Sequence, residues 1–240
     1  MKKKIFYTLV LASLLALVSC RDCVHGDGNI ITEDRANDVS DFDQIELNGS
    51  FDLELIQDSE YKVVIEGDEA ILRLISSRVS NHRLVVETKS NKCFSSNGSI
   101  LLRISAKDIS KIILSGSGNV YCDSLTTNNL EVRISGSGDI RLTKLLANHI
   151  DAVIAGSGNI NLNGACDNSF LNIDGSGDIR AFNLVQKNCD LQINGSGNIF
   201  TSFFEKLTGT INGSGNVMYK TANGQVNINI NGSGSVRNEN

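Results

Sequence analysis

The sequence predicts an all-β protein that folds as a single parallel β-helix, or solenoid, with coils of about 20 residues. The first observation is a Gly-Ser-Gly motif that returns seven times, with its first glycine at positions 116, 136, 156, 175, 195, 213 and 232. The second is an alternation of apolar and polar residues before each motif, which is typical of strands. The third is the absence of proline from the 240 residues, which lets every residue donate a backbone hydrogen bond to a neighbouring coil.

The position two residues before each motif predicts an interior column. It is aliphatic throughout, and six of its residues are isoleucines: Ile134, Ile154, Ile173, Ile193, Ile211 and Ile230. Coils about 4.8 Å apart would stack these side chains directly over one another. Right-handed winding is expected, because the hexapeptide series typical of left-handed helices is missing from the sequence.

Each motif predicts a sharp corner followed by a second strand. A valine or isoleucine follows the motif at a fixed offset, from Val120 in the first copy to Val236 in the last. Glycine suits such a corner because it permits positive φ and lets adjacent backbones approach closely. The spacing slips by one or two residues in the middle of each coil, which predicts a variable turn opposite the motif.

The chain before residue 116 carries weaker versions of the pattern. Leu47-Asn48-Gly49-Ser50-Phe51 is interpreted as a degenerate coil, and the alternative is an Asn-Gly hairpin over residues 44–56. Asp68 is expected to cap a short helix, which is expected to cover the open end of the stack; the alternative is a surface excursion without that role. The apolar residues of this helix are Ile71, Leu72, Leu74, Ile75 and Val79. Strands are expected at 61–66, 83–88, 100–105 and 111–114.

The amino terminus has the layout of a secretory signal. Three lysines precede an apolar run from Ile5 to Val18 that is too short to span a membrane comfortably. The run ends in Leu17-Val18-Ser19-Cys20, which resembles the bacterial lipobox. This resemblance implies cleavage before Cys20 and attachment of a diacylglyceryl group to its sulfur, and an ordinary secreted protein is the alternative.

Besides the lipidated Cys20, five cysteines would remain after cleavage, and an odd number cannot all pair within the chain. Cys122, Cys166 and Cys189 stand at different offsets from their motifs, so they are expected to be small buried residues. Cys23 and Cys93 could meet near the tethered end, and the sequence leaves their pairing open. The predicted organisation has four parts: a lipoprotein signal peptide at 1–19, a lipidated tether with a first degenerate motif at 20–41, degenerate coils with the helix at 42–115, and regular coils at 116–240.

The order of these motifs resembles one protein family. It includes a Gly-x-Gly-Asn-Ile opening at 26–30, Phe42-Asp43-Gln44-Ile45, Leu84-Val85-Val86 and the Gly-Ser-Gly series. In this order they resemble the autotransporter adhesin head domain family, also called head GIN domain proteins, over nearly all of the mature chain. The resemblance implies a β-helix, an envelope protein of Bacteroidetes-type bacteria and an adhesive role. It carries no catalytic residue over to this chain.

The strongest polar feature is the position after the second glycine of each motif. The residues there are Asn119, Asp139, Asn159, Asp178, Asn198, Asn216 and Ser235. We interpret them as a ladder of turn hydrogen bonds. The alternative, a calcium site, requires the two aspartates to share one ion, although a full coil separates each from the other and leaves them roughly 9 to 10 Å apart. Arg141 and Arg180 follow the two aspartates by two residues, and each is expected to neutralise its own acid.

Two classes of function fit these observations. The favoured one is a non-catalytic envelope lipoprotein without a metal or other cofactor, held on the outer membrane through Cys20 and acting as an adhesin or scaffold. Its expected partners are a surface glycan or protein, or further copies of itself. The alternative is a carbohydrate-active enzyme, because β-helices host polysaccharide lyases and hydrolases. The net charge of −5 argues against nucleic acid, and His25, His82 and His149 are expected at surface or turn positions because no metal spacing surrounds them.

Overall fold

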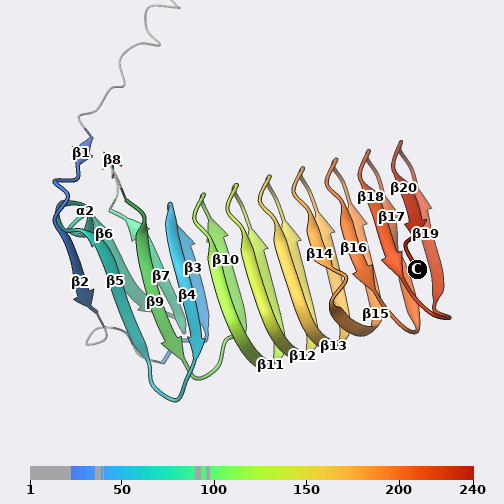
Figure 1. Ribbon diagram of the computed structural model, residues 1–240, viewed down its shortest axis with the longest axis horizontal. Coiled ribbons are helices and arrows are strands. Elements are labelled where there is room, and N and C mark those ends of the chain that lie inside the picture. Colours follow the sequence, from blue (N-terminus) through green and yellow to red (C-terminus); the bar gives the residue numbers. More distant parts are fainter. Residues whose placement is uncertain (1–22, 36–38, 40, 90–92, 96–97) are drawn as a thin grey trace, which may run out of the picture.

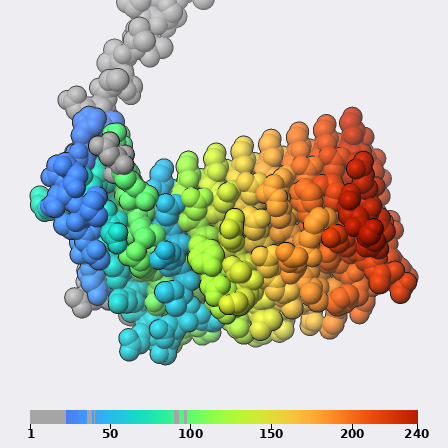
Figure 2. Space-filling model, viewed as in Figure 1, coloured from blue at the N-terminus to red at the C-terminus, as the bar shows by residue number. Residues whose placement is uncertain are grey.

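The chain folds into a row of stacked coils, as Figure 1 shows. This computed structural model describes residues 23–35, 39, 41–89, 93–95 and 98–240. The predicted signal peptide and Cys20 lie outside the described residues. In the space-filling view of Figure 2, the coils from about residue 110 onward follow one another as successive bands in chain order along the long axis.

Parallel pairing joins each regular coil to the next, which confirms the predicted fold class. The strands from residue 111 onward are β10 (Lys111–Ser115), β11 (Val120–Ile134), β12 (Ile140–Ile154), β13 (Ile160–Ile173), β14 (Ile179–Ala181), β15 (Leu184–Ile193), β16 (Ile199–Ser202), β17 (Lys206–Ile211), β18 (Asn216–Lys220), β19 (Gln225–Ile230) and β20 (Ser235–Asn238). The direction in which the coils wind stays a prediction.

A single coil has three straight segments and three corners. In β12, inward and outward residues alternate except at residues 143–144 and 148–149, where two successive side chains point outward and the chain bends. The third corner is the Gly-Ser-Gly motif. We call the outward surfaces of the three segments the first face (residues 141–143 in this coil), the second face (144–148) and the third face (149–153).

The predicted interior column is present and forms the spine of the core. The six isoleucines pair one over the next without a break. The first five are fully buried, whereas Ile230 in the last coil is 41% exposed because no further coil covers it. The column also continues toward the amino terminus through Leu114, Leu47 and Val86.

The motif glycines are required for close approach and not for positive φ. The positive-φ glycines are Gly28, Gly49, Gly164 and Gly209, so the predicted left-handed bend at the repeated motif is wrong. A Cβ atom on Gly156 would instead lie 2.2 Å from the carbonyl oxygen of Gly136 in the preceding coil. Backbone packs directly on backbone at this corner, and any side chain would separate the coils.

The sequence predicts that coil length varies in the middle of each coil, and the structure has such a change there. It lies between the first and second segments, where Leu142 pairs with Leu162 but Leu145 pairs with Gly164, so that β13 is one residue shorter at this bend. Gly164 has φ +140, a conformation open mainly to glycine.

The degenerate motif around Gly49 forms a coil, as predicted. β3 (Gln44–Asn48) lies parallel to β10, and β4 (Phe51–Gln57) lies parallel to β11. The strands before and after Gly49 therefore pair with a coil 67 residues away, and the hairpin alternative is wrong. Phe51 takes the place of the second glycine, since a Cβ atom on Gly118 would lie 1.8 Å from the Phe51 carbonyl oxygen.

The inserted residues between these coils build a cap at the amino-terminal end. The remaining elements are β1 (Val24–His25), β2 (Ile30–Asp34), β5 (Lys62–Asp68), α2 (Glu69–Leu72), β6 (Ile75–Ser80), β7 (Arg83–Thr88), β8 (Phe94–Ser95) and β9 (Ile100–Ala106). Antiparallel pairing joins β2 to β5, β5 to β9 and β6 to β7, unlike the parallel coils. The early motif at 26–30 therefore leads into a cap strand and not into a coil, and its Ile30 is 57% exposed.

The helix begins as predicted but is shorter. The Asp68 side chain accepts a hydrogen bond from the Ala70 backbone N–H at 3.0 Å, and Ile71 and Leu72 are buried. From Ile75 the chain is a strand, because β6 pairs with β7. The helix lies at the end of the stack (Figure 1), so the helix and the antiparallel strands together cover that end. Among the described residues, no helix has the length and apolarity needed to cross a bilayer.

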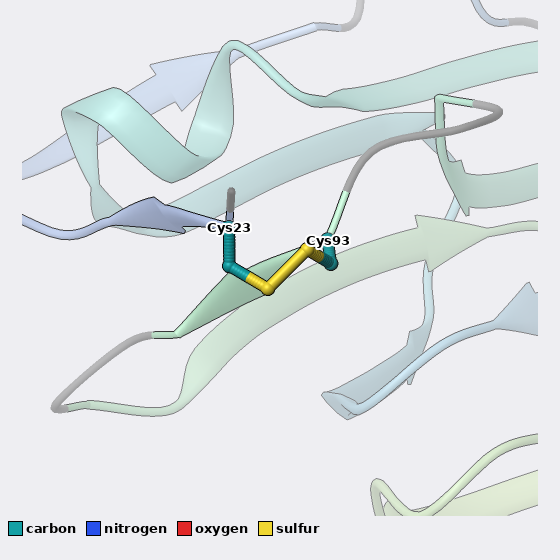
Figure 3. The surroundings of a disulfide bond; sticks show 2 residues. All are labelled: Cys23 and Cys93. Carbon is teal, nitrogen blue, oxygen red and sulfur yellow. A yellow bond between two sulfur atoms is a disulfide. The ribbon is translucent and has the colours of Figure 1, made fainter. Parts of the chain in front are cut away.

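A disulfide joins Cys23 to Cys93, which resolves the pairing that the sequence left open (Figure 3). It ties β1, which contacts α2, to the segment that begins β8. The remaining cysteines Cys122, Cys166 and Cys189 are free and buried, as predicted. Burial raises the pKa of Cys122 and Cys189 to about 11 and that of Cys166 to about 12, so all three thiols are protonated at neutral pH.

Candidate functional site

The predicted polar ladder runs along the Gly-Ser-Gly corner. Asn198 shows how it works: its backbone N–H and its Nδ2 both donate to Oδ1 of Asp178, each at 3.0 Å. Its own Oδ1 then accepts from the backbone N–H and Nδ2 of Asn216, at 3.2 and 2.9 Å. The series continues to Ser235 and begins one coil earlier than the repeats, at Asp52, which accepts from Asn119.

Acids and amides alternate in the first six places of this ladder, from Asp52 to Asn198. An amide lies between each acid and the next, so a carboxylate always receives a side-chain N–H and never stacks on another carboxylate. The ladder amides therefore make their hydrogen bonds largely inside the protein. They hold the coils together, and the binding of a partner must fall mainly to outward rows.

A second amide ladder lies just before the motif, at a position that the sequence analysis did not single out. Nδ2 of Asn194 donates to Asp174 at 2.6 Å, Asn212 donates to Asn194 at 2.8 Å, and Asn231 donates to Asn212 at 3.0 Å. The signal was present in the sequence, because an Asp or Asn precedes each of the last four motifs.

The two predicted Asp-Arg pairs behave differently. Arg180 donates to Asp178 at 2.7 Å and lies over the Phe200 ring, 5.8 Å from its centroid. In the part of the chain that the structure describes, no ion pair joins Arg141 to Asp139, so that prediction is wrong for this coil. Oδ1 of Asp139 accepts two hydrogen bonds from Asn159, as Oδ1 of Asp178 does from Asn198, and Arg141 is exposed on the first face.

Arg141 lines an open groove on the first face. The groove has a volume of about 520 Å³, and we call it the first-face groove. Its lining is drawn from four coils and consists of Tyr121, Arg141, Thr143, Asn161, Asn163, Arg180, Phe182 and Asn183. Two guanidinium groups, three amides and two aromatic rings thus face one hollow, and its lining has no carboxylate.

Strand register explains why these groups gather. Tyr121, Arg141, Asn161 and Arg180 occupy one row, each paired with the next. Asn163 precedes Gly164 on the shorter bend, where the register with the preceding coil shifts between Leu142 and Leu145. The shorter coil therefore lies at the middle of the groove.

The other grooves have different chemistry. One on the third face is lined by four charged residues that neutralise one another, because Arg83 pairs with Glu46 and Arg78 with Glu87. Another, of about 460 Å³, lies on the second face and includes Leu146 and Ala165. Leu146, Ala165 and Val185 form an apolar row along this face, in which Leu146 and Val185 are exposed and Ala165 is half-buried.

The histidines are all exposed, in keeping with the surface or turn positions expected for them. His82 lies in a turn with φ 60, and its Nδ1 lies 3.1 Å from the Asp41 carbonyl oxygen. Among the described residues, no cluster of three or more His, Cys, Asp or Glu side chains is arranged to hold a metal ion.

Comparison with solved structures finds the same fold in several bacterial proteins. A "putative adhesin" from Bacteroides fragilis gives a TM-score of 0.81 at 23% identity, covering 90% of this chain and 99% of that chain. A "Putative lipid binding protein" from Parabacteroides distasonis gives 0.77 at 24% identity, covering 91% and 100%. A "putative adhesin" from Parabacteroides merdae gives 0.69 at 22% identity, covering 92% and 100%. Comparison with proteins of curated function gives no match.

The family comparison agrees with the resemblance seen in the sequence. The model described as "Putative auto-transporter adhesin, head GIN domain" matches residues 41–222, which include the antiparallel cap strands β5 and β6 and most of the regular coils. This match spans more than half of the 240 residues. The chain therefore belongs to the auto-transporter adhesin, head GIN domain family.

Proposed function

We propose that this chain is a non-catalytic envelope lipoprotein that serves as an adhesive or scaffolding module. The observation that carries the proposal is the repetition of the outward surface. A catalytic site needs different groups converging on one point, whereas here similar polar groups recur along an axis. Such a surface suits an extended or multivalent partner, whose weak contacts with successive coils add together.

The proposed anchor fits this role. Cys20 lies three residues before Cys23, and Cys23 is held at the capped end of the stack by its disulfide. A lipid on Cys20 would therefore place the cap next to the membrane. The regular coils, roughly 30 Å of stack for seven motifs, would extend away from it.

The far end of the stack supports a second mode of association within the same proposal. Among the described strands, β19 pairs with β17 alone and β20 with β18 alone. Val226 and Ile230 are exposed on this last coil. We propose that copies of the chain can associate here by strand addition. Sedimentation at increasing concentration should show dimers that Ile230→Lys removes, and a monomer at all concentrations would contradict this mode.

A binding screen tests the main proposal. The soluble chain from Asp22 onward should be applied to arrays of glycans and extracellular-matrix proteins. We expect retention on an extended ligand, with affinity that rises steeply when the protein is presented in several copies. The same preparation should be incubated with polysaccharides and assayed for new reducing ends or unsaturated products. Turnover would overturn the proposal in favour of the carbohydrate-active enzyme.

The anchor has its own test. Cys20→Ser should release the protein from membranes or block its maturation, and mass spectrometry should find lipid on the mature amino terminus. An unmodified mature terminus at another residue would refute the anchor. Protease treatment of intact cells would then separate surface display, which removes the coils, from a periplasmic location, which protects them.

A further inference from the structure

We propose that the first-face groove binds an acidic glycan that lies along the solenoid axis and carries a carboxylate on every second sugar. This inference rests on the proposed adhesive function and names the ligand class and the face that holds it. Its evidence is the composition of the groove, the spacing of its two arginines and the contrast with the groove on the third face.

The charge of the groove is unbalanced. The whole chain has a net charge of −5, yet the groove has two arginines and no acid in its lining. Arg141 makes no ion pair among the described residues, and Arg180 uses one nitrogen on Asp178 and leaves its other N–H groups available. The third-face groove also has two arginines, but both are neutralised by glutamates. The first-face groove thus keeps one guanidinium group, that of Arg141, without an ion-pair partner among the described residues, and this group attracts an anion.

The spacing of the arginines selects the ligand. Asn161 pairs with Arg141 on one side and with Arg180 on the other, so the two guanidinium groups lie two coils apart, about 10 Å. One coil corresponds closely to the length of one sugar residue in an extended glycan. Two arginines separated by an amide therefore match a disaccharide repeat with one acidic sugar and one neutral sugar.

The remaining groups suit the sugars themselves. Tyr121 is 44% exposed and offers an aromatic surface for the apolar face of a sugar ring. Asn161 and Asn163 offer amides to hydroxyl groups. Phe182 is held by an edge contact to Phe200, with centroids 5.5 Å apart, and by Lys220, whose Nζ lies 4.8 Å from its centroid. The groove is therefore partly ordered before any ligand arrives, which lowers the entropic cost of binding.

The ligand carboxylate has a specific role. A guanidinium group forms two parallel hydrogen bonds with a carboxylate, and this fork favours a sugar acid over a neutral sugar. Binding should also weaken as salt is added, because the groove is open to solvent.

The test compares hyaluronan oligosaccharides, which carry one carboxylate per disaccharide, with the same oligosaccharides after reduction of the carboxylates to alcohols. Dextran sulfate serves as a charged polymer without the alternation. Titration calorimetry of the soluble chain should give binding to hyaluronan that is about 10-fold or more weaker after carboxyl reduction. Arg141→Gln should cause a loss of the same size, and Tyr121→Ala should weaken binding to a lesser degree.

The control variant is Arg73→Gln, which removes the same charge from the cap, where the Arg73 side chain is 72% exposed. It should leave binding unchanged, and thermal melting should show that both arginine variants are folded. The inference is overturned if carboxyl-reduced hyaluronan binds equally well, if Arg73→Gln loses as much affinity as Arg141→Gln, or if dextran sulfate binds more tightly than hyaluronan. If no glycan binds while a matrix protein does, the inference fails and the adhesive function stands.

Discussion

Asn159 donates two hydrogen bonds to Asp139 at the corner of two successive coils. The backbone N–H and Nδ2 of Asn159 donate to Oδ1 of Asp139, each at 2.8 Å. The Asn159 carbonyl oxygen accepts from the backbone N–H of Ile140, the residue after Asp139, at 2.9 Å. The side-chain amide of Asn159 therefore adds to the backbone hydrogen bonds that join the two coils at this corner. An acid in the preceding coil accepts the hydrogen bond that the amide donates, which is why acids and amides alternate there.

Replacing this amide with an acid should destabilise the stack. Asn159→Asp would remove the side-chain donor to Asp139 and place carboxylates on three successive coils. We expect a loss of about 1–3 kcal/mol in the free energy of unfolding at pH 7. Asn161→Asp, two residues further on, adds the same charge between Arg141 and Arg180 and should cost little. Equal melting temperatures for the two variants would refute the structural role of the ladder.

Adding a methyl group at the motif should separate two coils. Gly156→Ala places a Cβ atom 2.2 Å from a backbone carbonyl oxygen that cannot rotate away. The expected cost is about 3 kcal/mol, measured by chemical denaturation. At Gly98 a Cβ atom would have nothing within 4 Å, so Gly98→Ala is the matched control and should unfold like the parent protein.

Opening the disulfide should weaken the cap. Cys23 and Cys93 close a loop with a sequence separation of 70 residues. Chain entropy gives about 4 kcal/mol for a loop of this size. The double variant Cys23→Ser and Cys93→Ser should therefore melt at a lower temperature than the oxidised protein. A reducing agent should lower the melting temperature of the parent to that of the variant and leave the variant unchanged, and a parent indifferent to reduction would contradict this.

Asp151 should reduce stability at neutral pH. Burial raises its pKa, and the neighbouring Glu131 raises it further, while one of its oxygens lacks a hydrogen-bond partner among the described residues. A raised pKa means that the folded state binds the proton more tightly, so the penalty is full above the folded pKa and is relieved as pH falls through it. Asp151→Asn should thus raise the melting temperature at pH 7 by an amount that shrinks as the solution is acidified. A gain that is constant with pH would exclude this cause.

Periodicity was sufficient to predict the regular coils because the interactions between them repeat. The interior isoleucines, the first ladder and the degenerate coil at Gly49 could all be located by their offset from a motif. The cap could not, because its strands leave the period: β5 pairs antiparallel with β2 and β9, which are far away in sequence, and β6 folds back on β7 as a hairpin. The coil at residues 44–57 pairs on one side with the coil that begins at residue 111, and residues 58–110 lie on its other side. No local sequence pattern indicates this arrangement.

The groove was missed for a different reason. Tyr121, Arg141, Asn161 and Arg180 share one offset, so their row could be found in the sequence. Their gathering into a hollow with Thr143, Asn163, Phe182 and Asn183 depends on how neighbouring coils stack, which the sequence does not show.

Like side chains of successive coils share one core and thereby hold the outward rows in register. The most direct measurement compares the melting temperatures of Ile193→Asp and Ile230→Asp, which place the same charge in the same column. Ile193 is fully buried between Ile173 and Ile211, whereas Ile230 is 41% exposed in the last coil. We predict that Ile193→Asp costs several kcal/mol and that Ile230→Asp costs less than about 1 kcal/mol. Similar melting temperatures for the two variants would contradict the stacked column.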